Sequence, residues 1–261
     1  MRRLVRSELI KLRTTRMWWG LLIGVVGLVA LNVVPSALFA GQEMGPPGMP
    51  VSPTLDEIAG LTAVYGAGYQ SGFLLVLVLG IIIGAADMRH RTATQTFLAT
   101  PGRGRVVIAK MLVAAMAGLV YGLVAQVVTI LVAAPVVLAR GADLHLGDAA
   151  VARSLALGVP GIALWGVIGV ALGVLLRSQI AAILVAVAYI FIGDFLIAGG
   201  FSLANLDGAV PYTPNNASAA VVGGFTGFDL LDWWAGMLVL LGYGLVIGVL
   251  GWAIGRNRDI A

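Results

Sequence analysis

Six apolar stretches, each at least about 20 residues long, constrain what this 261-residue chain can fold into. They run from Met17 to Ala40, Leu55 to Ala86, Val106 to Leu138, Ala149 to Leu176, Ser178 to Gly199 and Trp233 to Gly255. About 20 apolar residues in a helix cross the roughly 30 Å hydrocarbon core of a bilayer. Only 11% of the residues are charged, against about 25% in soluble domains. The sequence therefore predicts an all-α polytopic membrane protein, a single transmembrane domain (residues 1–261) with six transmembrane helices.

The positive charges give this domain a direction. With a cytoplasmic N-terminus, all but two of the 16 lysines and arginines lie in cytoplasmic segments, the exceptions being Arg140 and Arg153. Loops rich in lysine and arginine stay on the cytoplasmic side of a membrane. We therefore expect both termini to be cytoplasmic, in a multi-pass protein of the cell membrane that is surrounded by lipids.

Residues 1–16 precede the first span and are strongly basic. Leu4, Val5, Leu9 and Leu12 share one broad stripe at helical spacing, while Ile10 falls outside it. The pattern predicts an amphipathic helix at the cytoplasmic membrane interface. An ordinary basic anchor for the first span needs only the charges and is the alternative.

A basic, threonine-rich stretch interrupts the apolar sequence between the second and third spans. Thr92 or Thr94 can cap a short helix there, and Pro101 ends it. Phe97 and Leu98 are apolar residues in this cytoplasmic segment. The pattern suits docking into a groove of another protein, but it also suits a helix resting on anionic lipid headgroups.

Polar residues in and beside the spans are candidates for a transport pathway or gate. The one acid well within a span is Asp194, and a carboxylate inside a membrane suggests a function. Capping or pairing near the outer surface is the alternative for Asp194, and interhelical hydrogen bonds are the alternative for Gln70, Tyr121 and Gln126. The full candidate set is Gln70, Tyr121, Gln126, Asp194, Asn215 and Asn216.

The outer segment, residues 200–232, contains an apolar piece from Ala217 to Phe225 that is too short to span a bilayer. It predicts a re-entrant or interfacial helix.

The interrupting stretch resembles the loop between spans two and three of type-two ATP-binding-cassette (ABC) exporter permeases. The resemblance rests on Asp87, Arg89-His90-Arg91-Thr92, Leu98-Ala99-Thr100-Pro101 and Ala109-Lys110, in this order. The family commonly has glutamate where this chain has Asp87. Three further pieces resemble the family's N-terminal helix, its turn between spans four and five, and its last outer segment: Ser7–Arg16, Leu175–Ala182 and Tyr212–Gly223.

The resemblance implies a membrane pathway formed as a dimer, with a second copy or a paralogue, and driven by a separate ABC ATPase. Residues 87–105 would be the coupling loop, whose short helix around Thr92 to Thr100 would dock on the ATPase. The coupling residues implied are Asp87, Arg91, Thr92, Thr94, Phe97, Leu98 and Pro101. The cargo expected for an apolar path is a hydrophobic or amphiphilic compound, such as a drug, a lipid or a peptide antibiotic.

Missing motifs limit the chemistry of the chain. No phosphate-binding G-x-x-x-x-G-K-[ST] sequence occurs, so ATP and Mg²⁺ are expected on the partner ATPase. With no cysteine and two histidines, we expect no metal site. The spans contain no paired nucleophile and base, so we expect no enzymatic activity. We also expect no bound cofactor and no nucleic-acid partner. The alternative function is an ion-coupled secondary transporter that uses Asp194, although no internal repeat between the three-span halves supports it.

Overall fold

The computed structural model describes residues 1–42, 53–89, 103–224 and 229–257, and within these ranges every regular element is helical. Six helical stretches there are long and apolar enough to cross a membrane, so the prediction of an all-α protein with six candidate transmembrane helices is confirmed. Five of them are single helices: α2 (Met17–Leu38), α3 (Ile58–Arg89), α5 (Arg103–Ala139), α6 (Ala149–Leu176) and α10 (Trp233–Asn257).

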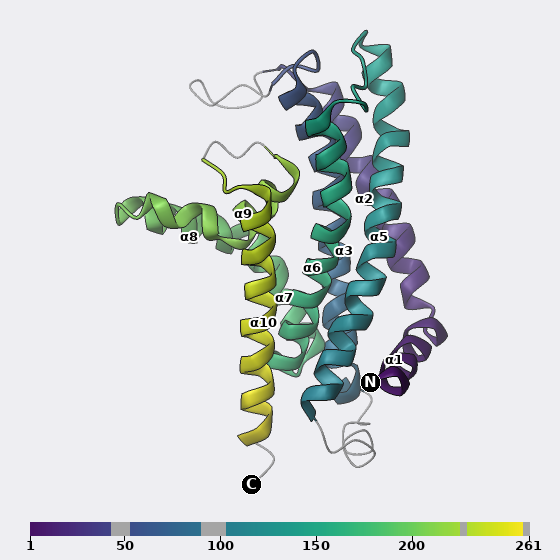
Figure 1. Cartoon of the computed structure of the whole chain (residues 1–261), viewed down its shortest axis with the longest axis vertical. Helices are drawn as coiled ribbons and strands as arrows, with labels where there is room; N and C mark the ends of the chain where they lie inside the picture. Colours follow the sequence, from purple (N-terminus) through teal and green to yellow (C-terminus); the bar gives the residue numbers. More distant parts are fainter. Residues whose placement is uncertain (43–52, 90–102, 225–228, 258–261) are drawn as a thin grey trace.

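These helices run along the longest axis of the molecule (Figure 1). The N-terminal helix α1 (Arg2–Thr14) and the last turns of α10 lie at the same end, as an even number of crossings requires. We refer to this as the basal end. Its cytoplasmic location remains a prediction from the positive charges.

Helix α6 forms the centre of the bundle and packs against α3, α5 and α10. Half of its residues are buried, and many of these are small. At Gly80 of α3, an added Cβ would collide with the carbonyl oxygen of Gly166 on α6. Small residues allow helix backbones in membranes to approach this closely, which gains van der Waals contact without any hydrophobic driving force.

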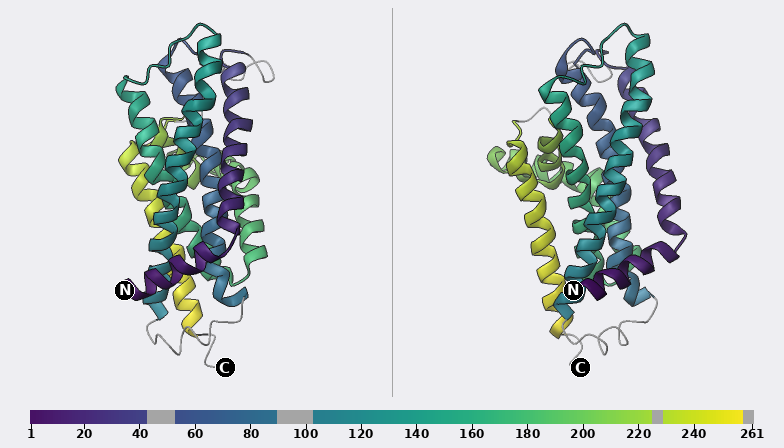
Figure 2. Two further views of the ribbon diagram at one scale, coloured as in Figure 1. Left: turned by 90° about the vertical axis from the view of Figure 1, so that its right-hand side faces the viewer. Right: turned by 45° about the vertical axis from the view of Figure 1, so that its right-hand side comes forward.

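Helix α1 is amphipathic, as the stripe of apolar residues predicts. Val5, Leu9 and Leu12 pack against the core, while Ile10, outside the stripe, is 53% exposed. The helix lies across the basal ends of the long helices and contacts α5 (Figure 2).

The fifth span is not the uninterrupted helix that the sequence predicts. It consists of α7 (Gln179–Ala188), the π-helical turn η1 (Tyr189–Gly193) and α8 (Asp194–Leu203). A π turn inserts an extra residue into the hydrogen-bond ladder and bends the helix. As a result α8 runs across the long axis instead of along it, and Asp194 lies directly after the bend (Figure 1).

After α8 the chain returns to the bundle through the 3₁₀ turn η2 (Asp207–Tyr212) and the nine-residue helix α9 (Pro214–Val222). Pro214 occupies the first turn of α9, where its missing N–H costs nothing. Gly223, with φ +67°, ends it in the left-handed conformation that glycine tolerates. All residues from Asn216 to Val222 are buried, and α9 packs against α10, α6 and α3.

Candidate coupling and pathway sites

Four charged side chains from three helices meet at the basal end. Lys110 of α5 lies 2.8 Å from the Glu8 carboxylate of α1 and 3.0 Å from the Asp87 carboxylate of α3. Lys11 of α1 bridges the other oxygens of the same acids, at 2.6 Å from Glu8 and 3.1 Å from Asp87. We refer to Glu8, Lys11, Asp87 and Lys110 as the ion cluster.

Three of the four side chains of the ion cluster are buried, so the attraction between them is strong and the loss of one partner is costly. The side chain of Lys110 is 4% exposed and those of Glu8 and Asp87 are 7% exposed, whereas Lys11 is 42% exposed. Lys110 also donates to the carbonyl oxygen of Ile83, at 3.0 Å. Burial by itself would lower the pKa of Lys11, but its hydrogen bond with Glu8 and the charges of Glu8 and Asp87 outweigh burial and raise that pKa above its ordinary value. Lys11 therefore stays protonated throughout the physiological pH range.

The ion cluster joins the two helix ends between which most of the predicted coupling loop runs. Asp87 is in the last turn of α3 and Lys110 is in the second turn of α5, so the two residues flank the intervening segment. The other predicted coupling residues lie outside the described residues: Arg91, Thr92, Thr94, Phe97, Leu98 and Pro101.

Sequence reasoning picked out Asp87 only through the family resemblance and missed the role of Glu8. The signal was present, because Glu8 falls between Leu4 and Leu12 on the apolar stripe of α1. An acid in the middle of an apolar face needs a buried partner. Lys110, near the start of an apolar span, was the corresponding basic signal.

A second site lies farther from the basal end, where α3, η1 and α9 border a cavity of about 450 Å³, the polar cavity. Three of the candidate pathway residues, Gln70, Asn215 and Asn216, line this cavity together. Asn216 is 7% exposed and donates to the carbonyl oxygen of Val210, at 3.2 Å, and to the hydroxyl of Thr213, at 3.0 Å.

Asp194 is linked to the polar cavity through Asn215. Its carboxylate accepts a hydrogen bond from the Tyr189 hydroxyl at 2.7 Å and a longer one from the backbone N–H of Asn215 at 3.4 Å. The Asn215 amide donates to the carbonyl oxygen of Ile190, at 3.1 Å. The Oδ1 atom of Asn215 is buried and has no hydrogen-bond partner within the described residues.

Tyr121 and Gln126 lie away from this cavity. The Tyr121 hydroxyl donates to the carbonyl oxygen of Trp18, an interhelical bond from α5 to α2 of the kind expected as its alternative role. The Gln126 side chain is buried against Gly158, where an added Cβ would collide with the amide nitrogen. The structure therefore brings Gln70, Asp194, Asn215 and Asn216 into one region and leaves these two outside it.

A buried hydrogen-bond chain that sequence reasoning missed ties α9 to the core. The Trp165 indole N–H donates to the Ser218 hydroxyl at 2.8 Å, and Ser218 shares a 2.5 Å hydrogen bond with the Tyr69 hydroxyl. The rings of Phe73 and Trp165 stack with centroids 4.5 Å apart. These contacts hold α9 against α3 and α6 beside the polar cavity.

Replacing Ser218 with alanine should destabilise the protein, because Trp165 and Tyr69 then lose their shared partner. A buried donor without a partner costs about 1–3 kcal/mol. We expect a lower melting temperature in detergent for Ser218→Ala. Ser202→Ala, which removes only an exposed hydrogen bond to Asp207, is the matched control and should change stability by less than about 0.5 kcal/mol. Equal melting temperatures for the two variants would contradict the role given to Ser218.

Comparison with known proteins now gives these sites a context. A family model described as ABC-2 family transporter protein matches residues 4–193. Comparison with curated proteins finds no match. The matched region contains all four residues of the ion cluster and every coupling residue that the sequence suggested, and it gives no support to an ion-coupled secondary transporter. The chain therefore belongs to the ABC-2 transporter family and is a multi-pass membrane component of an ABC transporter.

Proposed function

We propose that this chain is the permease of a bacterial ABC exporter, forming the membrane pathway as a dimer with a second copy or a paralogue. A separate ATPase, which binds ATP and Mg²⁺, docks from the cytoplasm on the coupling loop. The cargo is a hydrophobic or amphiphilic compound. The family assignment supports the permease role, and the ion cluster is the observation that carries the proposed coupling.

The ion cluster suits the transmission of force. Asp87 and Lys110 join the two helices between which the coupling loop runs, and Glu8 and Lys11 join both to α1. A displacement of the loop by the ATPase would then move the ends of α3 and α5 as one unit. Because the linked groups are mostly buried, water does not screen their attraction as it does at a surface.

The polar cavity supports a pathway farther from the basal end. Gln70, Asn215 and Asn216 are polar residues that line it together, which suits the passage of a molecule with hydrogen-bonding groups. The cavity is bordered by η1 and α9, a π turn and a nine-residue helix. None of the five residues of η1 is buried, and segments with few buried contacts shift more readily than a packed helix, which suits a gate.

Docking can be tested by replacing both Phe97 and Leu98 with aspartate. Two charges in place of these apolar side chains should abolish co-purification of the chain with its ATPase, which we expect to be encoded beside it, because a hydrophobic groove does not accept unpaired carboxylates. The measurement is the amount of ATPase retained on the tagged permease after purification in detergent.

Leu146→Asp is the matched control, since Leu146 is a 41% exposed residue in the connection between α5 and α6 at the opposite end of the bundle. It should retain the ATPase as the unchanged chain does. Full retention by the Phe97→Asp/Leu98→Asp variant would show that the ATPase does not dock on this loop.

A further inference from the structure

Next to the polar cavity lies a second cavity of about 470 Å³, the aromatic cavity, within the range of sites for drug-sized molecules. Side chains of α6, α7, η1, η2 and α10 line most of it. Its lining is nearly all apolar, and Ile190 is a wall residue common to both cavities. The described helices thus border a partly open space within a single chain that suits a hydrophobic body.

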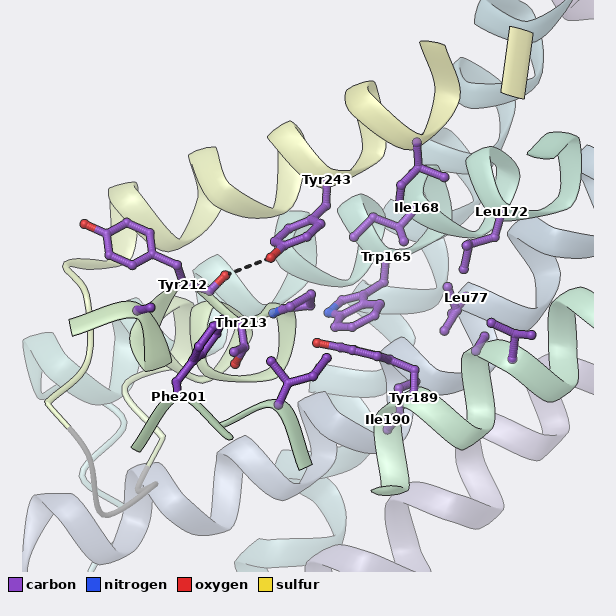
Figure 3. A pocket seen from close by; sticks show the side chains of 16 residues that line it. Leu77, Trp165, Ile168, Leu172, Tyr189, Ile190, Phe201, Tyr212, Thr213 and Tyr243 are labelled. Carbon is purple, nitrogen blue, oxygen red and sulfur yellow. Dashed lines mark hydrogen bonds between the residues drawn. The ribbon is translucent and has the colours of Figure 1, made fainter. Parts of the chain in front are cut away.

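Five of the sixteen residues that line this cavity are aromatic. Trp165, Tyr189 and Tyr243 surround the space, with Phe201 and Tyr212 at one end (Figure 3). The polar atoms of three rings are already engaged: Trp165 with Ser218, Tyr189 with Asp194, and Tyr243 with the carbonyl oxygen of Tyr212 at 3.2 Å. What the rings offer to a ligand is therefore mainly their faces, which are electron-rich and attract cations.

A buried acid, Asp194, is hydrogen-bonded to one ring of this aromatic lining. The Asp194 side chain accepts a hydrogen bond from Tyr189, a ring of the cavity, and Asp194 is only 7% exposed. Within the described part of the chain Asp194 forms no ion pair, in contrast to Asp87, which pairs with two lysines. Burial of an ionised carboxylate without a cation is expensive, so a cation brought by a ligand would be strongly favoured here.

From this juxtaposition we propose that the aromatic cavity binds a lipophilic organic cation: a single positive charge carried on an apolar, preferably aromatic, body. The inference rests on the proposed function and names the class of cargo within it. The ring faces bind the cation, Asp194 neutralises it at long range, and the apolar walls hold the body. A lipophilic anion would be repelled by the same carboxylate, and a neutral lipid chain would gain nothing from it.

Tetraphenylphosphonium and tetraphenylborate provide a direct test, because they have nearly the same shape and opposite charges. The full-length chain is placed in nanodiscs of neutral phosphatidylcholine, and binding of each radiolabelled probe is measured by scintillation proximity. We expect the cation to bind and the anion to bind at least about ten-fold more weakly. Equal affinity for both probes, after correction for empty nanodiscs, would overturn the proposal.

The Asp194→Asn variant keeps the shape and the hydrogen bond from Tyr189 but removes the charge. It should weaken binding of the cation about ten-fold and reduce the preference over the anion. Asp207→Asn, an exposed acid of η2 held by Ser202, is the matched control and should bind as the unchanged chain does. Unchanged cation affinity in Asp194→Asn would also refute the proposal.

If Asp194→Asn does not fold, two variants of Tyr243 provide an independent test of the cation site. Tyr243→Phe keeps the ring face and should bind the cation within about two-fold of the unchanged chain, whereas Tyr243→Leu should bind it several-fold more weakly. Equal binding by these two variants would contradict the role of the rings.

The ATPase co-purification described above is run on the same preparations. A complex that assembles but binds both probes alike disproves only the cation site. A chain that binds the cation selectively but retains no ATPase disproves the coupling and leaves the cation site standing.

Discussion

Replacing Lys110 with methionine should destabilise the protein by about 3–5 kcal/mol, the cost of removing one partner from a buried ion pair. Methionine matches the length of the lysine stem but leaves the Glu8 and Asp87 carboxylates buried together with only Lys11 between them. We expect a large drop in melting temperature in detergent and a loss of ATPase-driven transport. The effect should be large because Lys110 contacts both acids and is 4% exposed.

Lys11→Met is the matched control for this experiment. Lys11 contacts the same two acids but is 42% exposed, so water can reach the place that it leaves and its removal should cost less than the removal of Lys110. A double variant with Glu8→Leu and Lys110→Met should recover part of the stability lost in Lys110→Met, because an apolar pair of similar volume leaves no unpaired charge on these two positions. Equal melting temperatures for Lys110→Met and Lys11→Met would show that burial does not decide the energetics of the ion cluster.

The second large effect is expected at Gly80, where α3 and α6 touch through their backbones. An added Cβ at Gly80 would collide with the Gly166 carbonyl oxygen, and one at Gly169 would collide with the Leu77 carbonyl oxygen. Backbone atoms cannot rotate away as a side chain does, so the helices must separate. Gly80→Ala should therefore cost about 1–3 kcal/mol or more, measured as a lower melting temperature in detergent.

Gly27→Ala and Gly242→Ala are matched controls within α2 and α10, because an added Cβ meets nothing within 4 Å at either position. Alanine is the better helix former by up to about 1 kcal/mol, so both controls should be neutral or slightly stabilising. If Gly80→Ala proves as stable as Gly27→Ala, then the close contact of α3 and α6 is not needed for the fold.

The two predictions also separate stability from coupling. Gly80→Ala perturbs the contact of two long helices, whereas Lys110→Met removes the ion pairs that join the helix ends on either side of the coupling loop. Transport per folded molecule should therefore fall further in Lys110→Met than in Gly80→Ala, when both are corrected for the amount of folded protein. This comparison links the ion cluster to the ATPase and not only to the fold.

The candidate site was predicted unevenly from the sequence. Gln70, Asn215 and Asn216 were picked out as polar residues in an apolar chain, but nothing in the sequence indicated that they border one cavity. Trp165, Ser218 and Tyr69 were missed because tryptophan, serine and tyrosine are ordinary residues in a membrane helix. Their importance comes from a hydrogen-bond chain that joins Ser218 to residues 53 and 149 positions away.

The sequence by itself determined the six candidate spans, the helix boundaries to within a few residues and the amphipathic character of α1. Each of these follows from the length or the periodicity of a local apolar pattern, which the solvent imposes on every helix separately. The bend at η1 escaped this reasoning, because the apolar pattern from Gln179 to Leu203 continues unbroken through the π turn.

Only the tertiary structure decided which residues act together. Glu8 and Lys110 are 102 residues apart in the chain, and no local pattern encodes that they meet. The same holds for Asp194 and Asn215, which are 21 residues apart and meet only because the chain after α8 returns to the bundle through η2 and α9. The physical reason is that hydropathy places a helix in the membrane, while small-residue contacts and buried polar pairs, each specific to two surfaces, place the helices against one another.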